Sequence, residues 1–323
     1  GKTALIRQII PRLTARRLNV AVIKHDAHGL SVDRKGKDSD VFFRAGADVL
    51  ACGPGESFLR QHSGRDGDLP GMIRALAPSH DLILVEGFKA AALPRKVWLR
   101  RTADDRPSVE AGRVALDLKP GRNRMAPVGR LVDEVLKEAC RRTPVYAGVL
   151  IGGRSERMGR PKHLLRSGGR TWLERTVSVI QPLVDEVVLL GGGRVPSSLK
   201  NLAVLPDANE GGGPLAGMLA AMRWSPEVSW IFLACDLPLI SRPAVRWLLA
   251  ARAPGVWAVL PKTSGGIAPL LAWYDFRARP LLESCSGPCQ IARSPKVISP
   301  TPARRLAGAW LNCNTPKDLD LLT

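Results

Sequence analysis

The chain has 323 residues, a hydrophobic content of 45% and a formal net charge of +19. This length favours two domains over one. No apolar run approaches the roughly 20 residues of a membrane helix, and we expect no membrane partner. The six cysteines lack the spacing of a zinc site or a disulfide framework, so we expect reduced thiols and a cytoplasmic protein.

The positive charge is mostly arginine and divides almost evenly between the two halves of the sequence. A diffuse positive field attracts polyanionic substrates. Aromatic residues make up only 5% of the chain and no nucleic-acid-reading motif is present, which argues against a nucleic-acid partner.

The first predicted elements follow the tripeptide Gly1-Lys2-Thr3. A helical pattern extends from it through Ala15, and Val20 to Lys24 is typical of a strand. Gly-Lys-Thr before a helix is the closing half of a P-loop, in which the lysine reaches the β- and γ-phosphates and the threonine holds Mg²⁺. The opening glycine and strand would lie before residue 1, so we expect that the sequence lacks its true N-terminus.

A second strand is predicted where Asp81 to Glu86 forms an apolar run that ends in an acid, as in a Walker-B strand. Polar loops cover residues 24–28 and 33–39. With these features, residues 1 to about 140 resemble the MobB-type adaptor of molybdopterin-guanine dinucleotide biosynthesis, a P-loop GTP-binding protein. The resemblance implies a GTP site that contains Gly1, Lys2, Thr3 and Glu86.

The boundary between the two halves is predicted after a helix at Leu131–Arg142, because Thr143-Pro144 ends the helical pattern and Val145 begins a strand. We therefore predict domains at residues 1–142 and 143–323. Strands alternate with helices in both, which indicates α/β domains with mainly parallel sheets. The first is expected to be P-loop NTPase-like and the second a Rossmann-like nucleotidyltransferase domain.

The most informative segment is the loop from Leu150 to Lys162. It follows an apolar strand, Val145 to Leu150, and precedes a helical pattern at His163–Val179. Gly152 and Gly153 allow phosphates to approach the backbone, whose N–H groups favour anions at such a place. Arg157 and Lys162 add positive charge, so the loop predicts a nucleotide triphosphate site.

Three further blocks accompany this loop: Gly213-Pro214-Leu215-Ala216-Gly217, the strand from Trp230 that leads to Asp236, and Asn312-Cys313-Asn314-Thr315-Pro316. Together the four blocks resemble the molybdenum cofactor guanylyltransferases of the MobA type. The resemblance implies a Mg²⁺-dependent transfer of GMP from GTP to molybdenum-molybdopterin, which forms molybdopterin guanine dinucleotide and pyrophosphate.

Candidate site residues follow from these blocks. Lys162 and Arg157 are the candidate cations for the triphosphate and the transition state, and Asp236, at the carboxyl end of its strand, is the candidate Mg²⁺ ligand and third catalytic residue. The expected GTP contacts are Leu150, Ile151, Gly152, Gly153, Lys162, Asp207, Gly213, Pro214, Leu215, Gly217 and Asp236. The expected molybdopterin contacts are Asn312 and Asn314.

Two alternatives stay open. Pro161 stands where the guanylyltransferase pattern usually has aspartate, and Gly-x-Pro-Lys is commoner in the related cytidylyltransferases of this cofactor. A different nucleotidyltransferase, such as a molybdopterin cytidylyltransferase, would be distinguished by its choice of nucleotide. The second alternative is a binding protein that delivers the cofactor to molybdoenzyme apoproteins or their chaperones, and it predicts cofactor binding without turnover.

Overall fold

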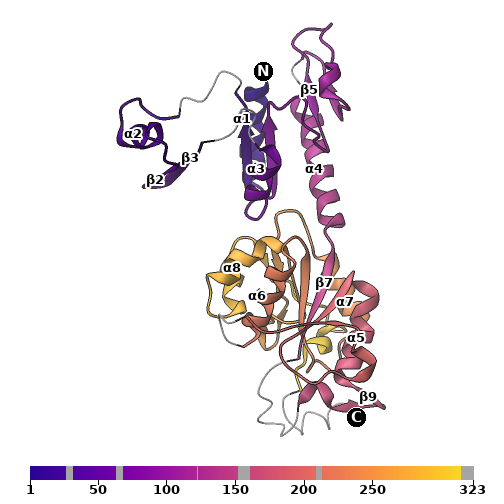
Figure 1. Ribbon diagram of the computed structural model, residues 1–323. Helices are drawn as coiled ribbons and strands as arrows, with labels where there is room; N and C mark the ends of the chain where they lie inside the picture. Colours follow the sequence, from indigo (N-terminus) through magenta and orange to yellow (C-terminus); the bar gives the residue numbers. More distant parts are fainter. Residues whose placement is uncertain (27–31, 63–67, 122, 152–160, 209–212, 314–323) are drawn as a thin grey trace. The chain divides into compact units, whose positions relative to one another are not determined.

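The computed structural model describes residues 1–26, 32–62, 68–121, 123–151, 161–208 and 213–313 (Figure 1). The chain forms two units. The first contains Gly1–Thr14 and Asn19–Gly129, and the second contains Ala15–Leu18 and the chain from Arg130 onward. No helix in the described ranges is long and apolar enough to cross a membrane.

The first unit is built around two parallel strands, β1 (Val20–Lys24) and β4 (Leu82–Glu86), which confirms both predicted strands. Helix α1 (Lys2–Thr14) contacts both of them (Figure 1). Asp81 fixes the start of β4, because its Oδ2 accepts a hydrogen bond from Asn19 N at 2.8 Å. The other elements are α2 (Asp38–Arg44), β2 (Val49–Gly53), β3 (Glu56–Arg60), α3 (Leu69–Leu76), β5 (Val97–Leu99), η1 (Val109–Ala111) and β6 (Leu116–Leu118).

Helix α4 (Met125–Arg142) begins in the first unit and continues into the second. The helix predicted at Leu131–Arg142 ends at the predicted residue but begins earlier, at Met125. Pro127 lies in the first turn of α4, where its missing N–H has no helical partner to lose, so the helix begins ahead of it. The domain division predicted at residues 142 and 143 falls at the end of this helix.

The second unit contains a seven-stranded sheet with the order β11-β10-β7-β12-β16-β13-β17. Four of its strand pairs are parallel, and β16 is antiparallel to both of its neighbours. The prediction of a mainly parallel α/β sheet is therefore confirmed. The strands are β7 (Val145–Leu150), β10 (Glu186–Leu190), β11 (Ala203–Leu205), β12 (Ser229–Ala234), β13 (Ala258–Val259), β16 (Ala272–Tyr274) and β17 (Val297–Ile298).

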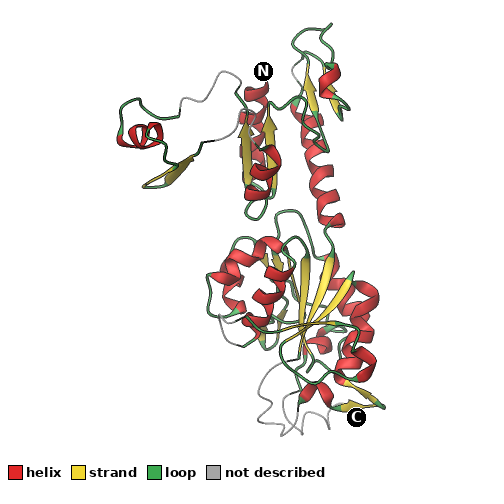
Figure 2. Ribbon diagram, in the orientation of Figure 1, coloured by secondary structure: helices red, strands yellow, loops and turns green. Residues whose placement is uncertain are grey.

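Helices cover both faces of this sheet (Figure 2). They are α5 (Trp172–Ile180), α6 (Pro214–Trp224), α7 (Arg242–Ala250) and α8 (Arg279–Glu283), with short helices η3 (Lys162–Leu164), η4 (Gln181–Leu183), η5 (Ser197–Leu199), η6 (Phe276–Ala278), η7 (Pro288–Arg293) and η8 (Ala307–Trp310). Two small antiparallel ladders join β8 (Arg166–Ser167) to β9 (Arg170–Thr171) and β14 (Lys262–Thr263) to β15 (Gly266–Ile267).

Alternating side chains of the central strands build a core on each face. On β12, Ile231 and Leu233 join the core beneath α5 and α7, whereas Trp230 and Phe232 join the core beneath α6 and α8. Gly148 on β7 makes room for this packing, because a Cβ there would lie 2.7 Å from both Leu190 and Phe232. The central strands are thus held rigidly, which fixes the positions of the loops at their carboxyl ends.

The helix predicted at His163–Val179 is wrong over its first half. Lys162–Leu164 forms η3, and the β8–β9 hairpin follows. Gly168 and Gly169 form the turn with φ of +59° and +78°, a conformation that interrupts a helix. Helix α5 begins at Trp172, after a capping box in which Thr171 and Glu174 exchange side-chain-to-backbone hydrogen bonds.

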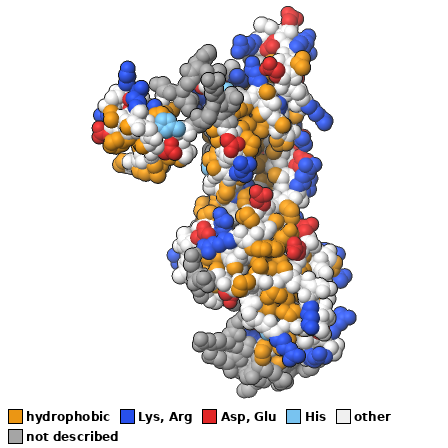
Figure 3. Space-filling model, in the orientation of Figure 1, with side chains coloured by type: hydrophobic (Ala, Val, Ile, Leu, Met, Phe, Trp, Pro, Cys, Tyr) orange, Lys and Arg blue, Asp and Glu red, His pale blue; other side chains and the backbone are white. Residues whose placement is uncertain are grey.

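The lysine and arginine side chains are dispersed over both units on the face shown in Figure 3. This distribution agrees with the even spread of charge along the sequence.

Candidate functional site

The carboxyl ends of β7 and β12 bring two of the predicted motifs together. These central strands are parallel neighbours, and Leu150, the last residue of β7, pairs with Ala234, the last residue of β12. The loop that leads to Lys162 and the loop that holds Asp236 therefore leave the sheet at the same edge, which is where ligands bind in open α/β sheets.

Lys162 and Asp236 form a direct contact at this edge. Lys162 Nζ donates a hydrogen bond to Asp236 Oδ2 at 3.0 Å, and the two side chains are only 19% and 17% exposed. Partial burial screens the pair from water, so the attraction is stronger than between fully exposed charges. Two residues that were predicted to act in catalysis thus meet in the folded chain.

The second carboxylate oxygen of Asp236 points to a missing partner. Asp236 Oδ1 is buried and accepts no hydrogen bond from any residue in the described ranges. A buried carboxylate oxygen without a partner is costly. The described residues contain no group of three or more histidine, cysteine and acidic side chains that would cage a metal. One carboxylate with an unpartnered oxygen suits Mg²⁺, which commonly takes one or two carboxylates plus phosphate oxygens and waters.

The C-terminal asparagine motif reaches the same aspartate. The backbone N–H of Cys313 donates to the carbonyl oxygen of Asp236 at 3.0 Å, and the Cys313 side chain is buried with Leu165 and Trp172. This anchor places the exposed Asn312 beside the Asp236 loop. Asn314 lies outside the described residues.

The predicted nucleotide contacts after β11 also converge. Gly213 precedes α6 with a φ of +61°, and Pro214 and Leu215 form the first helical turn. A Cβ on Gly217, in the next turn, would lie 2.9 Å from Leu150 Cδ2 and 3.2 Å from Asp207 Oδ1. Only glycine lets the exposed Asp207 and the end of β7 approach α6 this closely.

Ile151 is the next predicted residue of the phosphate loop that the structure describes. Ile151 is buried, and its N–H donates to the carbonyl oxygen of Leu190 at 2.9 Å, so this N–H is already engaged. Gly152, Gly153 and Arg157 lie outside the described residues.

His163 is a site residue that the sequence analysis did not identify. It is 4% exposed, and its Nε2 lies 3.0 Å from the carbonyl oxygen of Arg194. Burial lowers its pKa, so the imidazole is neutral and holds η3, with the adjacent Lys162, against the segment after β10. A single histidine next to a lysine carries no motif signal, so only the fold shows this role.

Cys235, the neighbour of Asp236, is a core residue rather than a nucleophile. It is buried, and desolvation together with the charge of Asp236 raises the pKa of its thiol to about 12. A thiol in such surroundings stays protonated and unreactive.

In the first unit, the structure brings together two residues of the predicted P-loop site. Thr3 Oγ1 donates a hydrogen bond to Glu86 Oε1 at 2.9 Å. Gly1 and Lys2, at the start of α1, are exposed. Because Lys24 pairs with Glu86 in the β1–β4 register, the ends of both strands lie at the same edge as Thr3.

Comparisons with known proteins match each half of the chain to a protein family. Residues 147–298 match the family described as "MobA-like NTP transferase domain", and residues 1–115 match "Molybdopterin guanine dinucleotide synthesis protein B". A protein of Pelotomaculum thermopropionicum named "Probable molybdenum cofactor guanylyltransferase" is 33% identical over 181 residues, which cover 53% of this chain and 88% of that protein. A protein of the same name from Bacillus mycoides is 32% identical over 136 residues, 41% of this chain and 68% of its own length.

Among solved structures, molybdopterin-guanine dinucleotide biosynthesis protein A from Archaeoglobus fulgidus is 23% identical, with a TM-score of 0.45, over 55% of this chain and 95% of that one. From the family matches and the sequence relatives, the chain belongs to the MobA-like nucleotidyltransferases, the family of the molybdenum cofactor guanylyltransferases, and it carries a MobB domain ahead of that enzyme domain.

Proposed function

We propose that the second unit transfers GMP from GTP to the terminal phosphate of molybdenum-molybdopterin, with Mg²⁺ as cofactor. The observation that carries this proposal is the contact between Lys162 and Asp236, with the buried and unpartnered Oδ1 of Asp236, at the carboxyl edge of the sheet. The names of the relatives, molybdenum cofactor guanylyltransferases, support a guanylyl group as the transferred group and the molybdenum cofactor as its acceptor.

The transfer requires that the negative charge of the triphosphate is neutralised and that the two substrates are aligned. An oxygen of the acceptor phosphate forms a bond to the α-phosphorus of GTP, and the bond from that phosphorus to the oxygen bridging to the β-phosphate breaks. The electron pair leaves with pyrophosphate, and an ionised phosphate nucleophile requires no general base. When bound, Mg²⁺ neutralises charge on the triphosphate.

In this proposal, Lys162 and Asp236 have separate roles in neutralising the triphosphate charge. Asp236 would hold the divalent cation, and Lys162 would donate hydrogen bonds to the triphosphate from the end of the phosphate loop. Both residues are anchored by rigid neighbours, Asp236 by the end of β12 and Lys162 by the buried His163, so the two charges keep a defined separation.

The second candidate, a cytidylyltransferase, is favoured by Pro161, which precedes η3 directly. The test is to incubate the full chain with molybdopterin, Mg²⁺ and each of GTP, CTP, ATP and UTP, and to measure pyrophosphate and dinucleotide. Preference for GTP supports the guanylyltransferase, and preference for CTP overturns the choice of base. Tight cofactor binding with no turnover would instead support a delivery protein that serves molybdoenzyme apoproteins or their chaperones.

For the first unit, we propose a GTP site formed by Gly1, Lys2, Thr3 and Glu86. The hydrogen bond between Thr3 and Glu86 supports this, because P-loop proteins place the threonine and the Walker-B acid together around Mg²⁺. Thr3→Ala in the full chain is expected to weaken the binding of one of two GTP equivalents in a calorimetric titration. A single binding step that Thr3→Ala leaves unchanged would contradict this site.

A further inference from the structure

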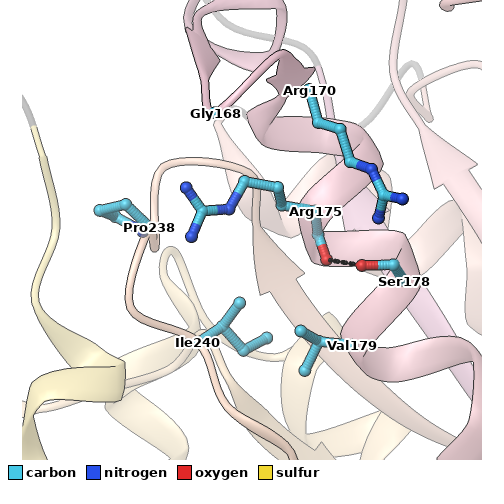
Figure 4. Close-up of a pocket in the computed structure, with 7 residues that line it drawn as sticks. All are labelled: Gly168, Arg170, Arg175, Ser178, Val179, Pro238 and Ile240. Carbon is cyan, nitrogen blue, oxygen red and sulfur yellow. Dashed lines mark hydrogen bonds between the residues drawn. The ribbon is translucent and has the colours of Figure 1, made fainter.

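A pocket of about 420 Å³ lies in the second unit between α5, the β8–β9 hairpin and the loop after β12 (Figure 4). It is lined by Gly168, Arg170, Arg175, Ser178, Val179, Pro238 and Ile240. This volume is within the roughly 300–1,000 Å³ of small-molecule sites. The sequence motifs assign none of these seven residues to a ligand.

The pocket borders the loop that carries Asp236. Pro238 is two residues beyond Asp236, so their Cα atoms lie within about 7 Å of each other even in an extended chain. Trp172, which begins α5, is buried with Cys313, and Cys313 N–H is bonded to the carbonyl oxygen of Asp236. The pocket therefore lies close along the chain to the candidate metal ligand, which itself is not among the lining residues.

The lining has the chemistry of a site for an organic anion. Arg175 extends from α5 toward Pro238, while Arg170 extends from the hairpin in another direction (Figure 4). Ser178 Oγ donates to the carbonyl oxygen of Arg175 at 2.8 Å, so this hydroxyl is used within the helix. Val179 and the buried Ile240 supply apolar surface. A guanidinium over such a surface binds a phosphate bidentately and stacks on planar rings.

We propose that this pocket binds the acceptor of the transfer reaction, a heterocyclic phosphate monoester, and that Arg175 contacts its phosphate. The inference rests on the proposed function. The triphosphate of GTP is expected against the loop that ends at Lys162, so a second phosphate substrate requires a cation outside that loop. Arg175 meets this need from a helix whose N-terminus is fixed by the Thr171–Glu174 capping box.

The test is steady-state kinetics of the full chain with GTP and molybdopterin. Arg175→Ala is expected to raise the KM for molybdopterin about tenfold or more, the effect of losing one charged hydrogen-bonding partner, and to leave the KM for GTP within about twofold. Arg175→Lys should recover part of the loss. The matched control is Arg246→Ala, because Arg246 is exposed on α7 and does not line the pocket. This variant should leave the KM for molybdopterin and the KM for GTP unchanged. Thermal unfolding of each variant checks the fold.

A second measurement is independent of turnover. Molybdopterin should co-elute with the wild-type chain and Arg246→Ala in gel filtration without nucleotide, and not with Arg175→Ala. An unchanged KM for molybdopterin in both Arg175→Ala and Arg175→Glu overturns the inference, as does a rise in the KM for GTP alone. If the wild type forms no dinucleotide, the proposed function fails. Co-elution then tests the acceptor pocket separately, because equal retention of molybdopterin by wild type and Arg175→Ala would refute the role of Arg175.

Discussion

Lys162 Nζ lies 3.0 Å from Asp236 Oδ2, so the cation expected to bind triphosphate is paired with the carboxylate expected to bind Mg²⁺. The ammonium group of Lys162 occupies Oδ2 and leaves the unpartnered Oδ1 for the metal. For nucleotide to bind as proposed, Lys162 must exchange this contact for one with the triphosphate. The pair therefore holds the aspartate in position, and the positive charge of Lys162 competes electrostatically with a metal that arrives without nucleotide.

The first prediction concerns this competition. Lys162→Ala removes the positive charge beside Asp236, so we expect the nucleotide-free protein to bind Mn²⁺, as a probe for Mg²⁺, about three- to tenfold more tightly. Electron paramagnetic resonance of free Mn²⁺ measures this affinity. Lys200→Ala, at an exposed lysine after η5, is the control and should leave it unchanged. Turnover by Lys162→Ala should fall with little change in melting temperature. Weaker Mn²⁺ binding would contradict the competition, and a large drop in melting temperature would make Lys162 structural.

The second prediction concerns the aspartate itself. Asp236→Asn keeps the shape of the side chain and removes its charge, so we expect an intact fold and a fall in turnover of roughly 10²-fold or more, comparable to the loss of other electrostatic transition-state stabilisers. Pyrophosphate release at saturating Mg²⁺ measures the effect. Glu227→Gln, at an exposed acid ahead of β12, is the control and should behave as wild type. Near-wild-type turnover by Asp236→Asn would refute its role.

The third prediction compares three glycines. Gly148→Ala places a methyl group 2.7 Å from Leu190 and Phe232 in the core, and such overpacking costs about 1–3 kcal/mol. Gly129→Ala, on α4, meets nothing within 4 Å and should stabilise its helix by up to about 1 kcal/mol. Gly217→Ala should displace Asp207 and raise the KM for GTP several-fold. Thermal unfolding and kinetics measure these effects, and a Gly217→Ala enzyme with an unchanged KM for GTP would argue against a nucleotide contact there.

The fourth prediction follows from the lowered pKa of His163. Burial disfavours the charged imidazole, so the unfolded chain binds more protons than the folded chain at mildly acidic pH. The second unit should therefore lose stability as the pH falls from about 7 to about 5. His163→Gln removes the titrating group and should make this loss of stability smaller. The control His80→Gln lies in the first unit and should leave the loss of stability of the second unit unchanged. Denaturant unfolding at each pH measures the difference, and equal pH dependence in wild type and His163→Gln would exclude His163 as the cause.

Local patterns were sufficient to predict several elements and residues. The apolar runs of β7 and β12 were predicted from the sequence because strands buried on both faces are continuously hydrophobic. The apolar runs of β1 and β4 were predicted in the same way, although these strands are less buried. Lys162 and Asp236 were found because Lys162 ends the glycine-rich loop after β7 and Asp236 follows the end of β12. The pattern at His163–Val179 was misleading, since Gly168 and Gly169 adopt positive φ and form a hairpin turn.

The amino-acid sequence by itself determined the class of both units, the order of their motifs and the candidate residues on each loop, since these depend on short-range patterns of apolar, glycine and charged residues. Only the tertiary structure decided which residues meet: Lys162 with Asp236, Cys313 with Asp236, Gly217 with Asp207 and Thr3 with Glu86. It also showed the buried His163 and the pocket at Arg175. These contacts join distant parts of the chain, and they depend on which strands pair in the sheet, a non-local choice made by packing of the whole core.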